Sequence, residues 1–252
     1  MIRLAAALLL LLVALPLRAE EVVADLSQTR VAITANFDGS EILIFGAVKR
    51  ESPIPPANDL GVIIAVEGPP EPVTIRRKSR VAGIWVNTAA AEIDAAPTFY
   101  AVATSAPLRS ILSETEDLRH RITTRNAIRA IDSGAAEELD LFTDALVRIR
   151  ASEDLYQTRE SAVVLRAQTL FSTEFTLPAN LTEGSYRTRI FLTRDRQVID
   201  AFETAIDVRK VGLERWIYNL AHDRPLIYGM LSIAIAIAAG WSASAVFRYI
   251  RG

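Results

Sequence analysis

Cysteine is absent from this 252-residue chain, and histidine occurs only twice. The absence of cysteine excludes disulfides, thiolate nucleophiles and cysteine-ligated zinc or iron–sulfur centres. Two histidines are too few for a metal site built from several imidazoles. The 28 basic and 30 acidic residues nearly balance, which argues against a nucleic-acid binder with its usual basic surface. Half of the residues are hydrophobic and the mean hydropathy is positive, so membrane segments are expected.

Motifs that carry catalysis are also lacking. The sequence has no nucleophile elbow, no glycine-rich dinucleotide loop and no phosphate loop. Glu116 and His120 are four residues apart on a predicted helix, but a third metal ligand is not nearby, and an ordinary charge pair explains them better. We therefore expect a protein that is not an enzyme, with no catalytic residue, no cofactor and no bound metal.

The first residues read as a secretory signal peptide. Arg3 precedes an apolar run, Leu4–Leu15, and Ala19 offers a small residue for cleavage. The run of about 12 residues is too short to cross a hydrocarbon core of roughly 30 Å. We predict a signal peptide over residues 1–19 that is cleaved before Glu20, with an uncleaved anchor as the alternative.

The other end of the chain predicts a transmembrane helix over residues 225–248. Its uncharged stretch is about 33 Å long as a helix, enough to cross a bilayer. Arg248 follows this stretch and favours the cytoplasmic side, and Tyr228 suits the opposite interface. Together with the signal peptide, this predicts a single-pass protein of the bacterial inner membrane. Its body would lie in the periplasm, and residues 249–252 would form a short cytoplasmic tail.

Small residues recur at every fourth position of this helix. Because lipid supplies no hydrophobic drive between helices, close approach through small residues is a main route to association. We interpret the stripe as a packing face for a multipass membrane protein or for self-association. The alternative is an alanine-rich anchor without a docking role. The stripe consists of Ser232, Ala236, Gly240 and Ser244.

Residues 211–224 predict a short amphipathic helix between the body and the anchor. Its apolar residues follow helical spacing, and Trp216 and Tyr218 suit the headgroup zone. Pro225 would separate this helix from the span. We expect it to lie on the outer leaflet, with His222 exposed.

The remaining chain predicts a mainly β body. Short β-rich runs with Gly and Pro turns between them are typical of immunoglobulin-like β-sandwiches. Tyr186 follows a loop that begins at Leu177, a pattern in which the phenol bonds back to the backbone. Between the β-rich parts we expect a helical insert, with one helix over Leu108–Ile122 and a later one with Leu139, Phe142, Leu146 and Ile149 on one face. The expected parts are a β-sandwich subdomain (20–105), the helical insert (106–151) and a second β subdomain (152–210). Two packed β subdomains are favoured over strands that complete the first sheet.

Two groups of arginines are candidates for contact with anions or lipid headgroups. The first lies in Arg76-Arg-Lys-Ser-Arg80, which we interpret as the basic tip of a hairpin. The alternative is a solvated turn without a binding role. The second repeats at every fourth residue and would line one face if a single helix continued past Thr123; pairing with nearby carboxylates is its alternative. The candidate residues are Arg76, Arg77, Arg80, Arg121, Arg125 and Arg129.

A series of short segments resembles the alphaproteobacterial transmembrane family called Alph_Pro_TM. Their order along the chain carries the resemblance, which is densest after Ala145 and extends over nearly the whole mature chain. The resemblance implies a class and a location and supplies no catalytic residues. It also implies a sulfite-exporter-type permease as partner. The segments are Ala145-Leu-Val-Arg-Ile-Arg150, Leu155-Tyr156, Leu170-Phe171, Leu177-Pro178, Gly184-x-Tyr186, Val208-x-Lys210-x-Gly212, Tyr228-Gly229, Ala239-Gly-Trp241 and Phe247-Arg248.

Two functions follow as hypotheses. The first is a membrane-anchored periplasmic accessory or adaptor protein that docks on a multipass partner through the small-residue stripe. The alternative is a periplasmic binding module whose arginines capture an anionic solute or polymer. Nothing in the charge pattern predicts binding to nucleic acid.

Overall fold

The protein, as a computed structural model, forms two compact units. The larger unit is the β-rich body, and the smaller one holds the helices that follow Arg209. The predicted signal peptide, residues 1–19, lies outside the described residues. The structure describes residues 20–33, 39–50, 60–130, 136–210 and 213–251.

Four strands form the first sheet of the body, in the order β1-β3-β10-β9 with antiparallel pairing throughout. On β10, Phe171, Thr173, Phe175 and Leu177 are buried and the residues between them are not. This period of two is expected where one face of a sheet packs on a core and the other faces water. The strands are β1 (Glu20–Leu26), β3 (Ser40–Arg50), β9 (Val164–Arg166) and β10 (Leu170–Leu177).

A second sheet has the order β2-β12-β11-β4-β7-β8. Strand β7 pairs with β8 in parallel, whereas β12, β11, β4 and β7 pair with one another in antiparallel fashion. The strands are β2 (Arg30–Ile33), β4 (Gly61–Glu67), β7 (Tyr100–Thr104), β8 (Tyr156–Arg159), β11 (Gly184–Arg194) and β12 (Gln197–Lys210).

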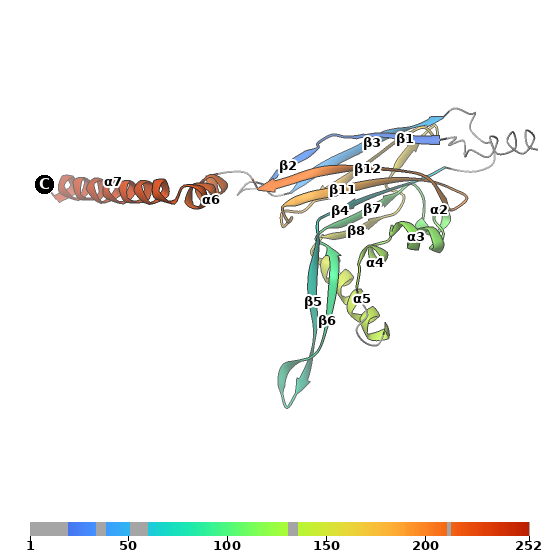
Figure 1. Ribbon diagram of the computed structural model, residues 1–252, viewed down its shortest axis with the longest axis horizontal. Helices are drawn as coiled ribbons and strands as arrows, with labels where there is room; N and C mark the ends of the chain where they lie inside the picture. The colour runs from blue at the N-terminus through green and yellow to red at the C-terminus, as the bar shows by residue number, and fades with distance from the viewer. Residues whose placement is uncertain (1–19, 34–38, 51–59, 131–135, 211–212, 252) are drawn as a thin grey trace, which may run out of the picture. The chain divides into compact units, whose positions relative to one another are not determined.

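The main core lies between these two sheets, which face each other in Figure 1. Ile42 and Ile44 from β3, Phe175 from β10 and Ile190 from β11 are each almost fully buried. The Val22 N–H donates to the carboxylate of Asp200 at 2.8 Å, which ties β1 to the facing sheet. The chain is therefore mainly β, as predicted, with a sandwich-like arrangement of its two larger sheets.

Strands β4 and β7 are buried on both faces, because helices cover the side of the sheet away from β3 (Figure 1). This double cover explains why residues 62–66 are all apolar instead of alternating. The covering helices are α2 (Leu108–Ile111), α3 (Glu114–His120) and α4 (Thr124–Ala127), and α5 (Ala136–Ser152) packs on α4 and β8.

The helical insert differs from the predicted single helix over Leu108–Ile122. Leu112 is extended, and Ser113 starts a new helix by accepting a hydrogen bond from the Glu116 N–H. Arg121 then ends that helix in the left-handed conformation, with φ of 50°. Serine is a favoured N-cap residue, so the local sequence at Ser113 itself explains the break. In α5, Phe142 and Leu146 are buried as expected, but Ile149 is exposed.

The two expected β subdomains are not separate. Strand β10 pairs with β3, and β11 pairs with β4, so residues 152–210 complete the sheets that the N-terminal strands begin. The reason is size: a few strands in about 50 residues bury too little apolar surface to form an independent core. The predicted boundaries at 105 and 151 therefore mark only the helical insert.

Tyr186 confirms the predicted loop-plus-tyrosine pattern. Its hydroxyl donates to the Thr182 carbonyl at 2.8 Å, and its ring is fully buried at 6.0 Å from the ring of Phe99. This contact fixes the loop at the start of β11.

A long hairpin forms a third, two-stranded sheet from β5 (Pro70–Val81) and β6 (Ile84–Pro97). Its base is anchored by Arg150, which bonds to Glu71 at 2.9 Å, and by a β-bridge between Ala95 and Arg129. The strands extend from the body as a separate ribbon in Figure 1. In the smaller unit, α6 (Leu213–Asp223) and α7 (Pro225–Arg251) follow each other.

Candidate functional site

Helix α7 contains a segment suited to a membrane. Pro225–Val246 is long and apolar enough to cross a bilayer, and none of its hydrophobic stretch is buried within the protein. Pro225 occupies the first helical position, where its missing N–H costs no hydrogen bond. The predicted span over residues 225–248 thus coincides with one helix. That helix continues to Arg251, so residues 249–251 of the expected tail are helical as well.

The small-residue stripe lies open along α7. Ser232, Ala236, Gly240 and Ser244 are all exposed. A Cβ added to Gly240 would meet no atom within 4 Å. The Ser232 hydroxyl donates to the Tyr228 carbonyl of the same helix at 2.9 Å. The side chain at residue 240 can thus be enlarged without contact with any other part of the folded chain.

Helix α6 is strongly amphipathic, as predicted for an interfacial helix. Trp216 and Tyr218 are exposed, and so is Tyr228 at the start of α7. The exposed His222 stacks on Tyr218 with ring centroids 4.0 Å apart. The side chain of Arg248, the fourth predicted interface residue, lies outside the described residues.

The hairpin places its basic residues differently from the prediction. Arg76, Arg77 and Arg80 lie within strand β5, and the turn is formed by Ala82 and Gly83. Both turn residues have positive φ, 50° and 89°, as a two-residue type I′ turn requires. The prediction of a basic tip is therefore wrong: the cations line the ribbon, and the tip is apolar.

The second arginine group does not form one surface. Arg121 ends α3, Arg125 lies in α4, and Arg129 follows α4 in the bridge to Ala95. The guanidinium of Arg125 bonds to the carboxylates of two α5 residues, Asp140 at 2.7 Å and Asp144. The helix needed to align the three arginines ends at His120, so they do not line one helix face as predicted. Pairing with nearby carboxylates, the alternative, holds for Arg125.

Glu116 and His120 lie within ion-pair distance of each other, as their spacing predicts, with His120 Nε2 at 3.5 Å from Glu116 Oε2. The buried carboxylate of Glu116 also accepts from Arg119 at 2.7 Å and from the Val198 N–H at 3.3 Å. Glu116 therefore joins α3 to the start of β12. Within the described parts of the chain, no group of three or more His, Asp or Glu side chains is placed to hold a metal ion.

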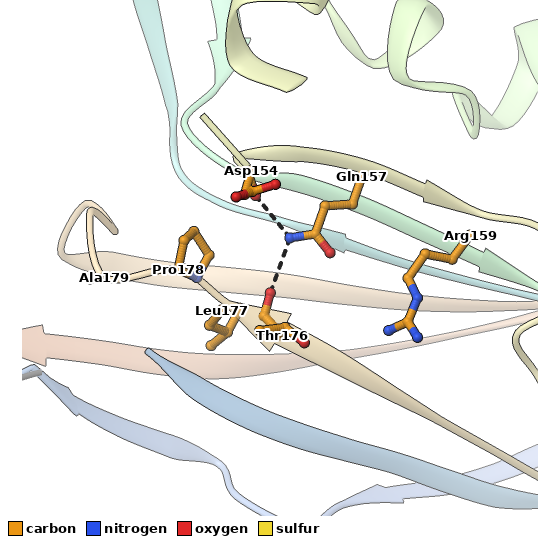
Figure 2. A pocket seen from close by; sticks show the side chains of 7 residues that line it. All are labelled: Asp154, Gln157, Arg159, Thr176, Leu177, Pro178 and Ala179. Carbon is orange, nitrogen blue, oxygen red and sulfur yellow. Dashed lines mark hydrogen bonds between the residues drawn. The ribbon is translucent and has the colours of Figure 1, made fainter. Parts of the chain in front are cut away.

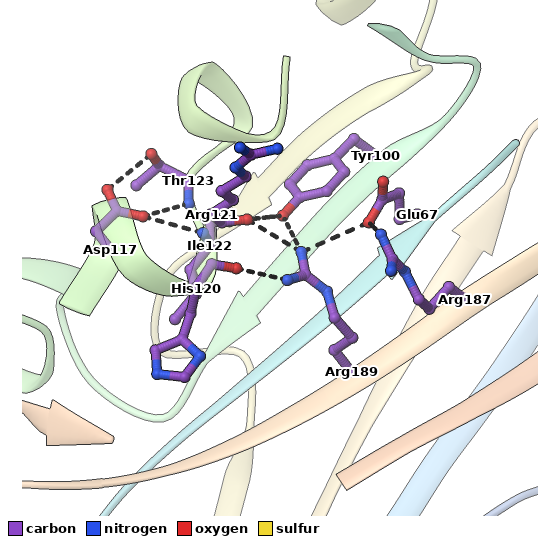
Figure 3. A network of polar contacts seen from close by, with 9 residues as sticks. All are labelled: Glu67, Tyr100, Asp117, His120, Arg121, Ile122, Thr123, Arg187 and Arg189. Atoms are coloured by element: carbon purple, nitrogen blue, oxygen red, sulfur yellow. Dashed lines mark hydrogen bonds and ion pairs between the residues drawn. The ribbon is translucent and has the colours of Figure 1, made fainter. Parts of the chain in front are cut away.

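A polar network that the sequence did not reveal centres on Arg189 of β11 (Figure 3). Its guanidinium donates to the carbonyls of His120 at 2.6 Å and Arg121 at 3.0 Å, and to the hydroxyl of Tyr100 at 3.2 Å. Glu67 lies 3.6 Å from the same guanidinium and 2.8 Å from that of Arg187. These residues hold the end of α3 against the sheet.

Tyr100 and Asp117 complete this network from opposite sides of the loop after α3. The Tyr100 hydroxyl donates to the Ile122 carbonyl at 2.8 Å, and burial raises the pKa of Tyr100 far above that of a free tyrosine. Asp117 accepts from the N–H groups of Ile122 and Thr123 at 3.1 and 2.7 Å. Most of these contacts satisfy backbone groups of the loop after α3, so the network acts as a structural clamp that holds this loop on the sheet.

A groove of about 560 Å³ opens between β8, the edge strand of its sheet, and the C-terminal end of β10 (Figure 2). Gln157 donates to the carbonyls of Asp154 at 2.8 Å and Thr176 at 3.1 Å. Arg159 donates to the Glu174 carbonyl at 2.7 Å. The polar side chains of the groove thus bridge the sheet edges and provide no paired acid and base.

Comparisons with known proteins agree with this membrane-anchored arrangement. A comparison with curated protein sequences gives no match. The family described as "Putative transmembrane protein (Alph_Pro_TM)" matches residues 21–249, which include the β body, the hairpin and most of α7. The match covers far more than half of the chain and is the family that the order of short segments indicated. The chain therefore belongs to the Alph_Pro_TM family of transmembrane proteins.

Proposed function

We propose that this protein is a non-enzymatic accessory subunit of the bacterial inner membrane. In this proposal α7 anchors a periplasmic β-rich body, and the stripe from Ser232 to Ser244 docks on a multipass membrane protein. A permease of the sulfite-exporter type is the partner that the family resemblance implies. The observation that carries the proposal is the open stripe on the one described span.

The spacing of the stripe supports close packing. Residues four apart form a ridge inclined to the helix axis, and small side chains along such a ridge let another helix approach. A single-pass anchor needs no such stripe if it only holds the body at the membrane.

Isolation of the tagged full-length protein from native membranes in mild detergent tests the proposal. We expect mass spectrometry to identify a multipass permease in stoichiometric amount. Gly240→Leu should abolish its recovery, because the added side chain keeps the two helices apart. Ala238→Leu is the matched control, since residue 238 lies on the opposite side of α7 at about 100° per residue.

Each outcome separates the alternatives. Loss of the partner in both leucine variants would point to general disruption of the helix and contradict the stripe. Recovery of the protein alone, as a dimer that Gly240→Leu dissociates, would replace the permease by self-association. An unchanged permease yield in Gly240→Leu would refute docking through this face.

A further inference from the structure

The far end of the β5–β6 hairpin is an apolar tip on an otherwise polar ribbon. Val81, Ile84 and Trp85 are exposed there, Trp85 by 69%. Burial stops at Ile75 and Ile93, and every residue between them is exposed or half-buried. A two-stranded ribbon is marginally stable in water, and clustered exposed apolar side chains commonly mark an interaction site.

Positive charge surrounds this tip. Residues 72–91 contain four basic and no acidic side chains. Of the chain's 28 basic residues four lie here, so the remaining residues carry 24 basic against 30 acidic side chains. The outer part of the hairpin is therefore a local cationic surface on a chain that is acidic elsewhere, which fits an anionic partner.

The strand register keeps these cations close to the apolar residues. Arg80 pairs directly with Trp85, and Val81 pairs with Ile84 at the turn. Farther back, Lys78 lies opposite Asn87 and Arg76 opposite Ala90, all neutral partners. Side chains directly opposite each other in an antiparallel pair are neighbours on one face, so an aromatic ring and a guanidinium share the tip.

We propose that the tip of this hairpin inserts into the surface of an anionic lipid bilayer. Trp85, Ile84 and Val81 would enter the headgroup and upper acyl region, where tryptophan is favoured. Arg76, Lys78 and Arg80 would bind lipid phosphates, with their aliphatic stems along the apolar surface. The body would then have a second membrane contact in addition to α7.

A bilayer explains the combination better than a soluble anion does. A solute or polymer that binds the cations gives no reason for three exposed apolar side chains at the end of the ribbon. An acidic protein surface would match the charge, but charge alone does not explain the exposed apolar side chains at the turn. A bilayer accepts both features, and family membership already places this chain at a membrane.

Tryptophan fluorescence in the full-length protein tests the insertion. The chain has three tryptophans, so the double variant Trp216→Phe and Trp241→Phe leaves Trp85 as the sole reporter. The protein is reconstituted into vesicles that carry a spin-labelled quencher lipid, with either phosphatidylcholine alone or added phosphatidylglycerol. We expect strong quenching of Trp85 in the anionic vesicles, and its reversal at high salt.

Two further variants fix the interpretation. Exchange of Arg76, Lys78 and Arg80 for glutamine should lower the ratio of inserted to free tip roughly a hundredfold, taking about fivefold per cation at an anionic surface. The reporter variant Trp85→Phe and Trp241→Phe leaves Trp216 and shows that reconstitution succeeded.

Quenching of Trp216 without quenching of Trp85 would overturn the proposal, whether or not α7 docks on a permease. Crosslinking of the hairpin tip to a protein in native membranes, without quenching of Trp85 by lipid in vesicles, would overturn it in favour of a protein partner. A response of Trp85 to inorganic phosphate without lipid quenching would overturn it in favour of a soluble anion.

Discussion

Replacing Glu20 by glutamine removes the negative charge that Arg50 and Arg194, two largely buried arginines, share. The Glu20 carboxylate accepts from Arg50 Nε at 2.6 Å, and both of its oxygens lie 2.8 Å from Arg194 Nη2. Only 8% of the Glu20 side chain is exposed. Arg50 also bonds to Thr169 and to the Gln168 carbonyl, so this cluster joins β1 and β3 to the loop before β10 and to β11.

The expected cost is large because the substitution removes a carboxylate charge that two largely buried guanidinium groups share. Breaking a buried ion pair by removal of one partner costs about 3–5 kcal/mol. For a unit of this size, each kcal/mol lowers Tm by about 2–4 °C, so we expect a fall of roughly 6–20 °C in Glu20→Gln. Glu21→Gln is the matched control. Its carboxylate pairs with Lys49 at 3.1 Å on the surface, where such pairs contribute about 1 kcal/mol or less.

The direction of the pKa shift of Glu20 predicts how its contribution to stability changes with pH. Burial raises the pKa of Glu20, but the hydrogen bonds and charges of Arg50 and Arg194 outweigh burial and hold the pKa below its usual 4.5. A carboxyl with a depressed pKa stabilises the fold above its unfolded pKa, and this stabilisation is lost as pH falls through the folded value. The Tm difference between wild type and Glu20→Gln should therefore be full at neutral pH and narrow below about pH 4.5.

Thermal unfolding of the detergent-solubilised protein, followed by near-ultraviolet circular dichroism from pH 3 to pH 8, measures both effects. A Glu20→Gln variant as stable as Glu21→Gln at neutral pH would refute the buried-ion argument. A Tm difference that stays constant down to pH 3 would refute the assigned direction of the pKa.

Two further substitutions test packing and hydrogen bonding in the same body. In Gly46→Ala the new Cβ would lie 2.5 Å from the ring of Phe171 and 2.7 Å from the Val23 carbonyl oxygen, so denaturant titration should show a loss of about 1–3 kcal/mol; Gly229→Ala, with open space around it, should show none. Tyr186→Phe should cost about 1 kcal/mol in the same titration, because the bond to Thr182 is lost. Burial raises the pKa of Tyr186 to about 12, so the wild type should lose stability as pH rises from 10 toward 12, and this loss should be smaller in Tyr186→Phe.

The elements that could be predicted are those whose signal is local. The uncharged stretch of α7 and the alternation in β10 each depend on neighbouring residues, and the structure has both. Strand β8 escaped prediction because only its first residue, Tyr156, is buried, so no alternation marks it. Its place is set by parallel pairing with β7, more than 50 residues earlier in the chain.

Pairing between distant strands is what the local pattern cannot specify. Hydrophobic period indicates that a strand has a buried face but not which strand lies beside it. Phe171 lies opposite Gly46 through such a pairing. The strands of the β subdomain predicted over residues 152–210 belong to the same sheets as the N-terminal strands. The same reason hides the clamp around Arg189, whose partners Glu67, Tyr100 and Arg121 come from three other elements.

The turn of the hairpin shows how one local misassignment changes a functional hypothesis. A run of charged residues is typical of a turn, which is why Arg76–Arg80 was expected at the tip. Ala82-Gly83 lacks the usual Asn-Gly signal, but glycine accepts positive φ at no cost and the strand pairing then aligns Arg80 with Trp85. Moving the turn by a few residues places Val81, Ile84 and Trp85 at the tip and the cations from Arg80 backward along the ribbon. A tip of arginines would favour a soluble anion, whereas an apolar tip with cations behind it has the order of a membrane interface from its interior outward.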